Sequence, residues 1–177
     1  MPQKLSSADK LGELIKVGAE AVAVRYEENL LRLTDQCESP IEKLLLAALH
    51  VGHDCMEFDV IFLGQDEPNI RFHRDETIYV YQQAKIGEYR ADFLILDCSV
   101  PEEIQAPRWM VVECDGHDFH ERTKEQARRD KKRDRFFQSL GFKVLRFTGS
   151  ELWADAIKCA EEVYSQLATN DRRGPYG

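Results

Sequence analysis

The chain has 177 residues, of which 43% are hydrophobic and 32% charged, with only ten Gly and six Pro, so it is neither a disordered polymer nor a fibrous repeat. This length suits one domain with a single sizeable core. The formal net charge of -8 excludes a protein whose whole surface coats nucleic acid, because such binding needs many basic side chains to displace phosphate counterions. A polyanionic partner must therefore meet a local basic patch or a bound metal ion.

The sequence also indicates a cellular setting. No segment approaches the roughly 20 apolar residues that span a bilayer, and the start of the chain has no apolar run typical of a signal peptide. The five cysteines are widely spaced and form no Cys-x-x-Cys pair, which favours reduced thiols over disulfides or a zinc site. We therefore expect a cytoplasmic protein.

Two helices are predicted at the start of the chain. Apolar residues at three- and four-residue steps predict an amphipathic helix from about Ser6 to Leu33, which needs a surface to pack against. Ser39, Pro40 and Glu42 then have the pattern of a helix start with a capping box. The apolar middle of this second helix predicts burial on more than one side.

The rest of the chain alternates between strand and helix patterns. The predicted strands cover residues 58–63, 77–86, 89–96, 109–115 and 142–147, and the predicted helices cover residues 121–140 and 148–167. The second and third strands have a turn between them and are expected to form a hairpin. This order predicts an α/β fold with a mixed sheet flanked by helices. We divide the chain into an N-terminal helical extension (1–36), one domain (37–168) and a polar tail (169–177).

Three carboxylates stand out in or beside apolar strands. Asp92 and Glu113 interrupt hydrophobic runs, where an ionised carboxylate needs a partner or a metal ion. Strand alternation places Asp115 on the same face as Glu113, with Cys114 on the other. If the strand of Asp92 lies beside that of Glu113, the three carboxylates converge and are tolerated mainly when a divalent cation neutralises them. Oxygen-only ligands predict Mg²⁺ or Mn²⁺.

The alternative is that each carboxylate is solvated or paired with Arg90 or Arg108. Glu42 has an alternative as well, since a capping-box glutamate is explained by helix chemistry alone.

Five segments, in their order along the chain, resemble the PD-(D/E)XK nuclease superfamily, and within it the small stand-alone relatives of the very-short-patch-repair endonucleases. The segments are Ser39–Glu42, Tyr89–Phe93, Val112–His120, Asp130–Asp134 and Gly141–Gly149. The resemblance covers about residues 38 to 155. It implies a restriction-endonuclease-like αβββαβ core, to which the first helix is an addition.

The resemblance also implies roles for individual residues. Asp92 and Glu113 would bind the metal ion, and Glu42 would complete or orient the site. The superfamily usually has Lys two residues after Glu113, whereas this chain has Asp115, which could act as a further metal ligand or as a base. Lys85 or Lys124 would then have to supply the missing positive charge.

Histidines and basic residues follow the last of these carboxylates. His117 and His120 are candidates for proton transfer to the leaving oxygen or for phosphate contact, or are simply solvated loop residues. Residues 121–135 contain eight basic and four acidic residues, a net charge of +4, which leaves -12 for the rest of the chain. We expect phosphate contacts from this segment, although a charged helix face is often only solvated. The residues assigned to nucleic-acid binding are Lys124, Arg129, Lys132 and Arg133.

The function expected from the sequence is that of a Mg²⁺- or Mn²⁺-dependent endonuclease hydrolysing phosphodiester bonds in DNA. The alternative is a nuclease-like module that binds nucleic acid or a partner protein without cutting. The first helix, which the resemblance does not cover, is a candidate for self-association or for docking onto a partner.

Overall fold

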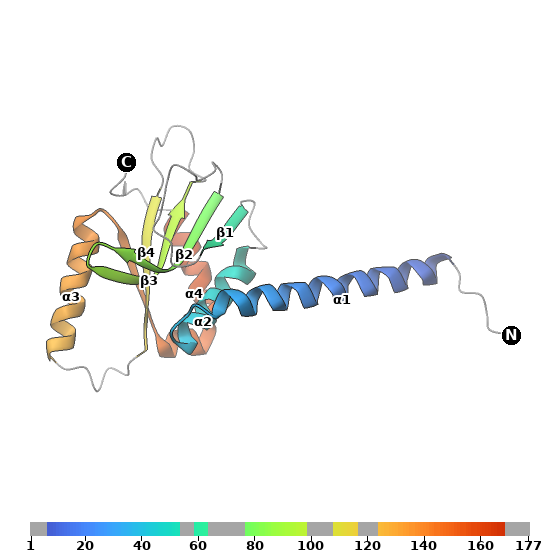
Figure 1. Cartoon of the computed structure of the whole chain (residues 1–177), viewed down its shortest axis with the longest axis horizontal. Coiled ribbons are helices and arrows are strands. Elements are labelled where there is room, and N and C mark those ends of the chain that lie inside the picture. The colour runs from blue at the N-terminus through green and yellow to red at the C-terminus, as the bar shows by residue number, and fades with distance from the viewer. Residues whose placement is uncertain (1–6, 54–58, 64–76, 99–107, 117–123, 169–177) are drawn as a thin grey trace.

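The computed structural model describes residues 7–53, 59–63, 77–98, 108–116 and 124–168 (Figure 1). It contains four helices and five strands in these ranges. They are α1 (Ser7–Thr34), α2 (Pro40–His53), β1 (Asp59–Leu63), β2 (Thr77–Ile86), β3 (Tyr89–Asp97), β4 (Arg108–Asp115), α3 (Lys124–Ser139), β5 (Lys143–Thr148) and α4 (Gly149–Ala168). Each predicted element is present within a few residues of its expected bounds.

The five strands form one mixed sheet in the order β1-β2-β3-β4-β5. The neighbours β2–β3 and β3–β4 are antiparallel, whereas β1–β2 and β4–β5 are parallel. The segment from α2 through β2, β3, β4 and α3 to β5 is the predicted αβββαβ core. Strand β1 is an additional parallel edge strand, and α3 is the crossover that parallel pairing of β4 with β5 requires.

Helices cover both faces of the sheet (Figure 1). The sheet separates the hydrophobic core into two clusters, one on each face. On one face, α2 and α4 bury apolar side chains such as Leu45, Leu49 and Val163 against the sheet. On the other face, Phe137 of α3 packs with Trp109 of β4. The predicted burial of α2 on more than one side is confirmed, since most of its middle is buried between the sheet and α4.

The predicted cap at the start of α2 is confirmed for Ser39, whereas the Glu42 carboxylate accepts from the Glu38 amide in place of the Ser39 amide. The Ser39 hydroxyl accepts a hydrogen bond from the Glu42 amide at 3.3 Å. A capping box, of Thr148 and Glu151, begins α4. The expectation of one uninterrupted last helix is wrong in detail, because Asp155 has φ -163° and ψ 85° inside α4 and its carboxylate accepts a hydrogen bond from the Lys158 amide. Asp155 is thus a second N-cap within the same apolar pattern.

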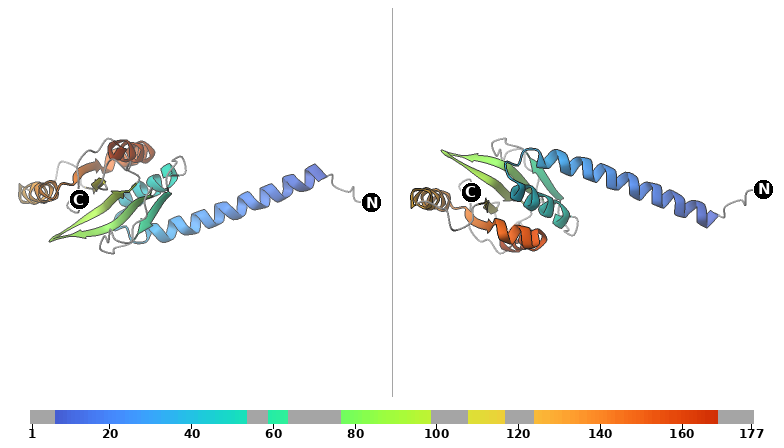
Figure 2. Two further views of the ribbon diagram at one scale, coloured as in Figure 1. Left: turned by 90° about the horizontal axis from the view of Figure 1, so that it is seen from above. Right: turned by 90° about the horizontal axis from the view of Figure 1, so that it is seen from below.

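Helix α1 extends away from the sheet and its helices (Figures 1 and 2). Its C-terminal part contacts α2, where the Tyr26 hydroxyl lies 3.0 Å from Nδ1 of His50 and Leu33 packs against the core. Farther toward the N-terminus, Leu14 and Ile15 are more than 60% exposed. The packing surface expected for this helix is therefore provided by its own chain only near its C-terminal end, and its docking role remains a prediction.

Two further expectations concern cysteines and membranes. Cys37, Cys114 and Cys159 are free thiols in the part of the chain that the structure describes, while Cys55 lies outside the described residues. In the part of the chain that the structure describes, every helix is too short or too polar to cross a bilayer.

Candidate active site

At Gln83 and Asp92, the side chains of β2 and β3 change the face of the sheet toward which they point. Ile78 and Val80 of β2 belong to the cluster under α2 and α4, yet Ala84 and Ile86, at the same alternation, belong to the cluster under α3. Strand β3 changes in the same way between Phe93 and Ala91. Both strands therefore exchange their faces at one level of the sheet.

The backbone of Gln83 explains this exchange. Gln83 has φ 52°, the left-handed region that costs a non-glycine residue about 1 kcal/mol or more. The register pairs Gln82 with Phe93 and Ala84 with Ala91, but the intervening positions, Gln83 and Asp92, do not pair. A local distortion of this kind interrupts regular pairing and redirects side chains. It frees Asp92 from the ladder.

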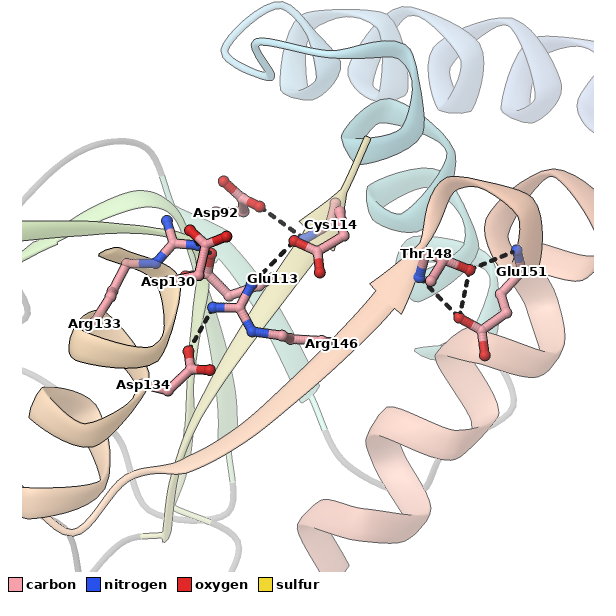
Figure 3. Close-up of polar contacts among 10 residues, drawn as sticks. Asp92, Glu113, Cys114, Asp130, Arg133, Asp134, Arg146, Thr148 and Glu151 are labelled. Atoms are coloured by element: carbon pink, nitrogen blue, oxygen red, sulfur yellow. Dashed lines mark hydrogen bonds and ion pairs between the residues drawn. The ribbon is translucent and has the colours of Figure 1, made fainter. Parts of the chain in front are cut away.

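The carboxylate of Asp92 reaches the neighbouring strand β4. Its Oδ2 accepts a hydrogen bond from the Cys114 amide at 2.7 Å (Figure 3). The backbone pairing of β3 with β4 ends at Phe93 and Val112. Beyond this pair, the Asp92 side chain provides a hydrogen bond between the two strands. The contact fixes Asp92 next to Glu113.

Glu113 lies on the α3 face of β4 and is 1% exposed. Its Oε2 forms an ion pair with the Arg133 guanidinium of α3 at 2.8 Å (Figure 3). Its Oε1 is buried and has no hydrogen-bond partner among the described residues. Cys114, the next residue, packs against the opposite cluster, which confirms the predicted alternation.

A second guanidinium, that of Arg146 on β5, lies beside the same strand. Arg146 is the register partner of Glu113 and binds the Asp115 carboxylate at 3.0 Å. Its other nitrogen binds Asp134 of α3. Arg146 thereby links β4, β5 and α3 (Figure 3), and it holds Asp115 on the same face as Glu113.

The two central carboxylates have raised pKa values. Burial, opposed by the hydrogen bond from Cys114, raises the pKa of Asp92 to about 6. Burial and repulsion from Asp92 raise the pKa of Glu113 to about 8, although Arg133 and Arg146 act in the other direction. The two arginines therefore offset only part of the cost of burying this charge.

Glu42 is also buried and serves two purposes. Its carboxylate accepts hydrogen bonds from the Glu38 amide, the Ser39 hydroxyl and Nε2 of Gln83, at 2.9, 2.7 and 2.7 Å. The first two contacts belong to the helix start. The third joins α2 to β2 at Gln83, where the strands exchange their faces. Glu42 also lies near enough to Asp92 to contribute to the raised pKa of Asp92. Glu42 thus takes part in the start of α2 and also lies beside Gln83 and Asp92.

The cations near the carboxylates differ from those expected. Arg133 and Arg146 act on the pKa values of Asp92 and Glu113, whereas the proposed Lys85 is exposed on the hairpin. Lys124, the other candidate, is exposed at the first residue of α3.

The alternative partners are engaged elsewhere. Arg90 pairs with Glu38, and Arg108 pairs with Asp97.

The expected convergence of three carboxylates is only partly observed. Ion pairs to Arg133 and Arg146 hold Glu113 and Asp115, and no three His, Cys, Asp or Glu side chains within the described ranges are arranged to hold a metal ion together. The donor set nevertheless fits a hard cation. Two carboxylates with raised pKa values lie together, and the buried oxygens Glu113 Oε1 and Gln83 Oε1 have no hydrogen-bond partner among the residues described.

Helix α3 separates its charges between two faces. Asp130, Arg133 and Asp134 are partly buried toward the carboxylates, whereas the outer face carries six exposed basic residues and one exposed acidic residue. The exposed basic residues are Lys124, Arg128, Arg129, Lys131, Lys132 and Arg135. Of the residues assigned to nucleic-acid binding, Arg133 is the one that lies on the inner face. His117 and His120 lie outside the described residues.

A model of the restriction endonuclease family REase_MTES_1575 matches residues 71–167, which is more than half of the chain. The chain belongs to this family. The matched segment contains all the site residues described above except Glu42. The comparisons with curated proteins and with solved structures found no match. REase_MTES_1575 membership agrees with the restriction-endonuclease-like fold seen here and identifies the chain as a nuclease relative.

Sequence reasoning missed three members of this site. The sequence pattern predicts phosphate binding for Arg133 and gives no role to Arg146 or Gln83. The signal for Gln83 is its place beside Gln82, because two adjacent glutamines in an otherwise apolar strand break the polar alternation expected of a half-buried sheet.

Proposed function

We propose that this member of the REase_MTES_1575 family is an endonuclease that hydrolyses phosphodiester bonds in DNA with the help of Mg²⁺ or Mn²⁺. The observation that carries the proposal is the pair Asp92 and Glu113, which lie together at the point where β3 and β4 separate, with raised pKa values. Buried acidic pairs of this kind cluster at functional sites. Carboxylate and amide oxygens are the ligands that these cations prefer.

The chain positions the reacting groups before substrate arrives. A cation held by Asp92 and Glu113 would stabilise negative charge on a phosphoryl oxygen, and it would lower the pKa of a bound water. Asp92 is fixed by the Cys114 amide, and Glu42 is fixed by three donors. Arg133 holds Glu113 and becomes available to phosphate when this carboxylate serves the cation.

Arg146 supplies the fixed positive charge that the superfamily lysine would give. It keeps its two carboxylate partners, Asp115 and Asp134, on the α3 side of the sheet. Asp115 then acts as an orienting partner or as a base. His117 and His120 stay candidates for protonating the leaving oxygen.

The DNA backbone would be held by the outer face of α3. Lys124, Arg129 and Lys132 are exposed there, and long basic side chains on a helix suit phosphate contacts that carry no sequence information. Arg133 would reach the phosphate from the inner side of the same helix.

A cleavage assay with matched variants tests the proposal. Purified protein should nick or cut supercoiled plasmid DNA with Mg²⁺ or Mn²⁺ and lose this activity in EDTA. Asp92→Asn keeps the shape of the side chain but removes its charge, and should lower the rate by about 100-fold or more, the upper range for groups that merely support metal ligands. Unchanged cleavage by this variant would refute the assignment.

Asp97→Asn is the control, since Asp97 is a buried acid on the same strand that pairs with Arg108 away from the site. It should retain cleavage. The alternative function, binding without cutting, has one observation in its favour: Glu113 already forms an ion pair with Arg133. It predicts salt-dependent DNA binding that Glu113→Gln does not weaken, and no metal-dependent cleavage by the wild-type protein.

A further inference from the structure

The role of Gln83 goes beyond the acidic residues of the site. Its side chain is 3% exposed, and only one end of its amide is hydrogen-bonded within the described part of the chain. Nε2 donates to Glu42 Oε2 at 2.7 Å, while Oε1 is buried with no partner in that part. An unsatisfied buried acceptor costs about 1–3 kcal/mol, so its retention calls for an explanation.

The backbone at this residue carries a second cost. Gln83 is the one non-glycine residue with positive φ in the described ranges. Its conformation interrupts the ladder opposite Asp92 and exchanges the faces of both strands. Glycine would adopt this conformation without penalty. A large amide side chain therefore occupies a position that backbone conformation alone would give to glycine.

We propose that Gln83 is a positioning residue of the active site, which holds Glu42 through its amide nitrogen and offers its amide oxygen to the hydrated cation. Its left-handed backbone releases Asp92 from the ladder toward β4. Gln83 thus binds the carboxylate of α2 and lies at the break in the ladder opposite the carboxylate of β3. This inference rests on the proposed function.

Gln83→Gly separates the two roles, because glycine keeps the backbone conformation and removes the amide. The stability of the variant in EDTA should stay close to that of the wild type, since relief of the left-handed strain and of the unpaired oxygen offsets the lost hydrogen bond to Glu42 and the greater freedom of glycine in the unfolded chain. Its dissociation constant for Mn²⁺, measured by isothermal titration calorimetry without DNA, should rise about 10- to 100-fold, as for groups that orient metal ligands. Cleavage should fall in parallel.

Two further variants complete the experiment. Gln83→Asn also tolerates the left-handed region but has an amide one methylene shorter, so it should show a similar loss of Mn²⁺ affinity and is the fallback if the glycine variant does not fold. Gln82→Ala is the matched control: it removes a buried amide that contacts Cys37, and should leave Mn²⁺ affinity within about twofold, well below the 10-fold effect of an orienting group.

The possible results discriminate between the two proposals. If the wild-type protein binds Mn²⁺ and the folded Gln83 variants bind it equally well, Gln83 has only a backbone role and the inference is overturned alone. If the wild-type protein binds no Mn²⁺, the proposed function fails and this inference fails with it.

Discussion

At the scale of single residues, the site is defined by buried charges that are only partly compensated. Glu113 has one guanidinium partner for two carboxylate oxygens, and Asp92 has a backbone amide. Removing a carboxylate from water costs several kcal/mol, and the partners in place do not lower the pKa values to their ordinary range. The protein therefore places two acids that are costly to ionise at the position of the proposed reaction.

The cost of ionising these two acids predicts a pH dependence of stability. The pKa values of Asp92 and Glu113 are raised in the folded state, to about 6 and about 8, and are near 4 in an unfolded chain. Folding therefore takes up protons between these limits, so that the stability contributed below the unfolded pKa is lost as pH rises through the folded pKa. The slope reaches at most about 1.4 kcal/mol per pH unit for each group.

Urea unfolding in EDTA between pH 5 and pH 9 measures this effect. The stability of Glu113→Gln relative to the wild type should increase over this range, because the wild type alone bears the growing cost of ionising Glu113. Glu125→Gln, at an exposed position on α3, should run parallel to the wild type. A constant difference between Glu113→Gln and the wild type would contradict the raised pKa of Glu113.

Sequence reasoning identified the acidic residues but not their partners. Asp92 and Glu113 are conspicuous because an acid within an apolar strand has few explanations. Arg133 is one of eight basic residues in a short segment, and its choice of Glu113 depends on which face of α3 packs against the sheet. Helical spacing alone does not rank those faces, because residues 128–135 are all charged.

At the scale of elements, the hairpin and α3 form one packed unit. Gly87, at the tip of the hairpin, has φ 61°, and a Cβ added there would lie 2.8 Å from Cζ of Phe136 on α3. Tyr89 of the hairpin stacks at a tilt against the same ring, with centroids 5.0 Å apart. The tip is therefore closed against the helix that provides Arg133.

Gly87→Ala tests this packing. The substitution should destabilise the protein by about 1–3 kcal/mol, because alanine must adopt a left-handed conformation and displace Phe136. Gly12→Ala is the matched control on α1: a Cβ there meets nothing within 4 Å, so the change should be neutral or stabilising by up to about 1 kcal/mol. Thermal and urea unfolding would measure both, and equal stability of Gly87→Ala and the wild type would exclude a tight contact.

The elements could be read from sequence far better than their distortions. Apolar runs and caps located every helix and strand, since burial and helix ends have local signatures. The exchange of faces at Gln83 has no local signature in the sequence. It arises because the hairpin packs against α2 and α4 at one end and against α3 at the other. The break of α4 at Asp155 escaped for a similar reason, as the apolar pattern continues through it.

At the scale of the whole molecule, the net charge of -8 conceals an uneven distribution. The outer face of α3 is basic, and the carboxylates gather on the side of this helix that faces the sheet. An acidic protein can thus offer a local phosphate-binding surface without an overall attraction to nucleic acid. Binding should then depend on few contacts.

The salt dependence of DNA binding counts those contacts. The double variant Lys124→Gln, Arg129→Gln should weaken binding and reduce the slope of log K against log salt by up to about 1.8, since each lost phosphate contact contributes about 0.9. Lys16→Gln combined with Lys158→Gln changes the net charge equally at exposed positions on α1 and α4, and should leave the slope unchanged. Fluorescence anisotropy of a labelled duplex in EDTA measures binding without cleavage. Equal slopes for the two double variants would place the DNA elsewhere.

The opposite charges on the two sides of α3 also affect how the molecule is oriented when it meets DNA. A basic outer surface and an acidic interior lie on opposite sides of a helix only about 10 Å across, so they form an electric dipole at this edge of the protein. In the electric field of DNA this dipole experiences a torque that turns the outer face of α3 toward the DNA, even though the protein as a whole is repelled. Encounters at low ionic strength are then fewer but already oriented, with the carboxylates directly behind the surface that arrives first.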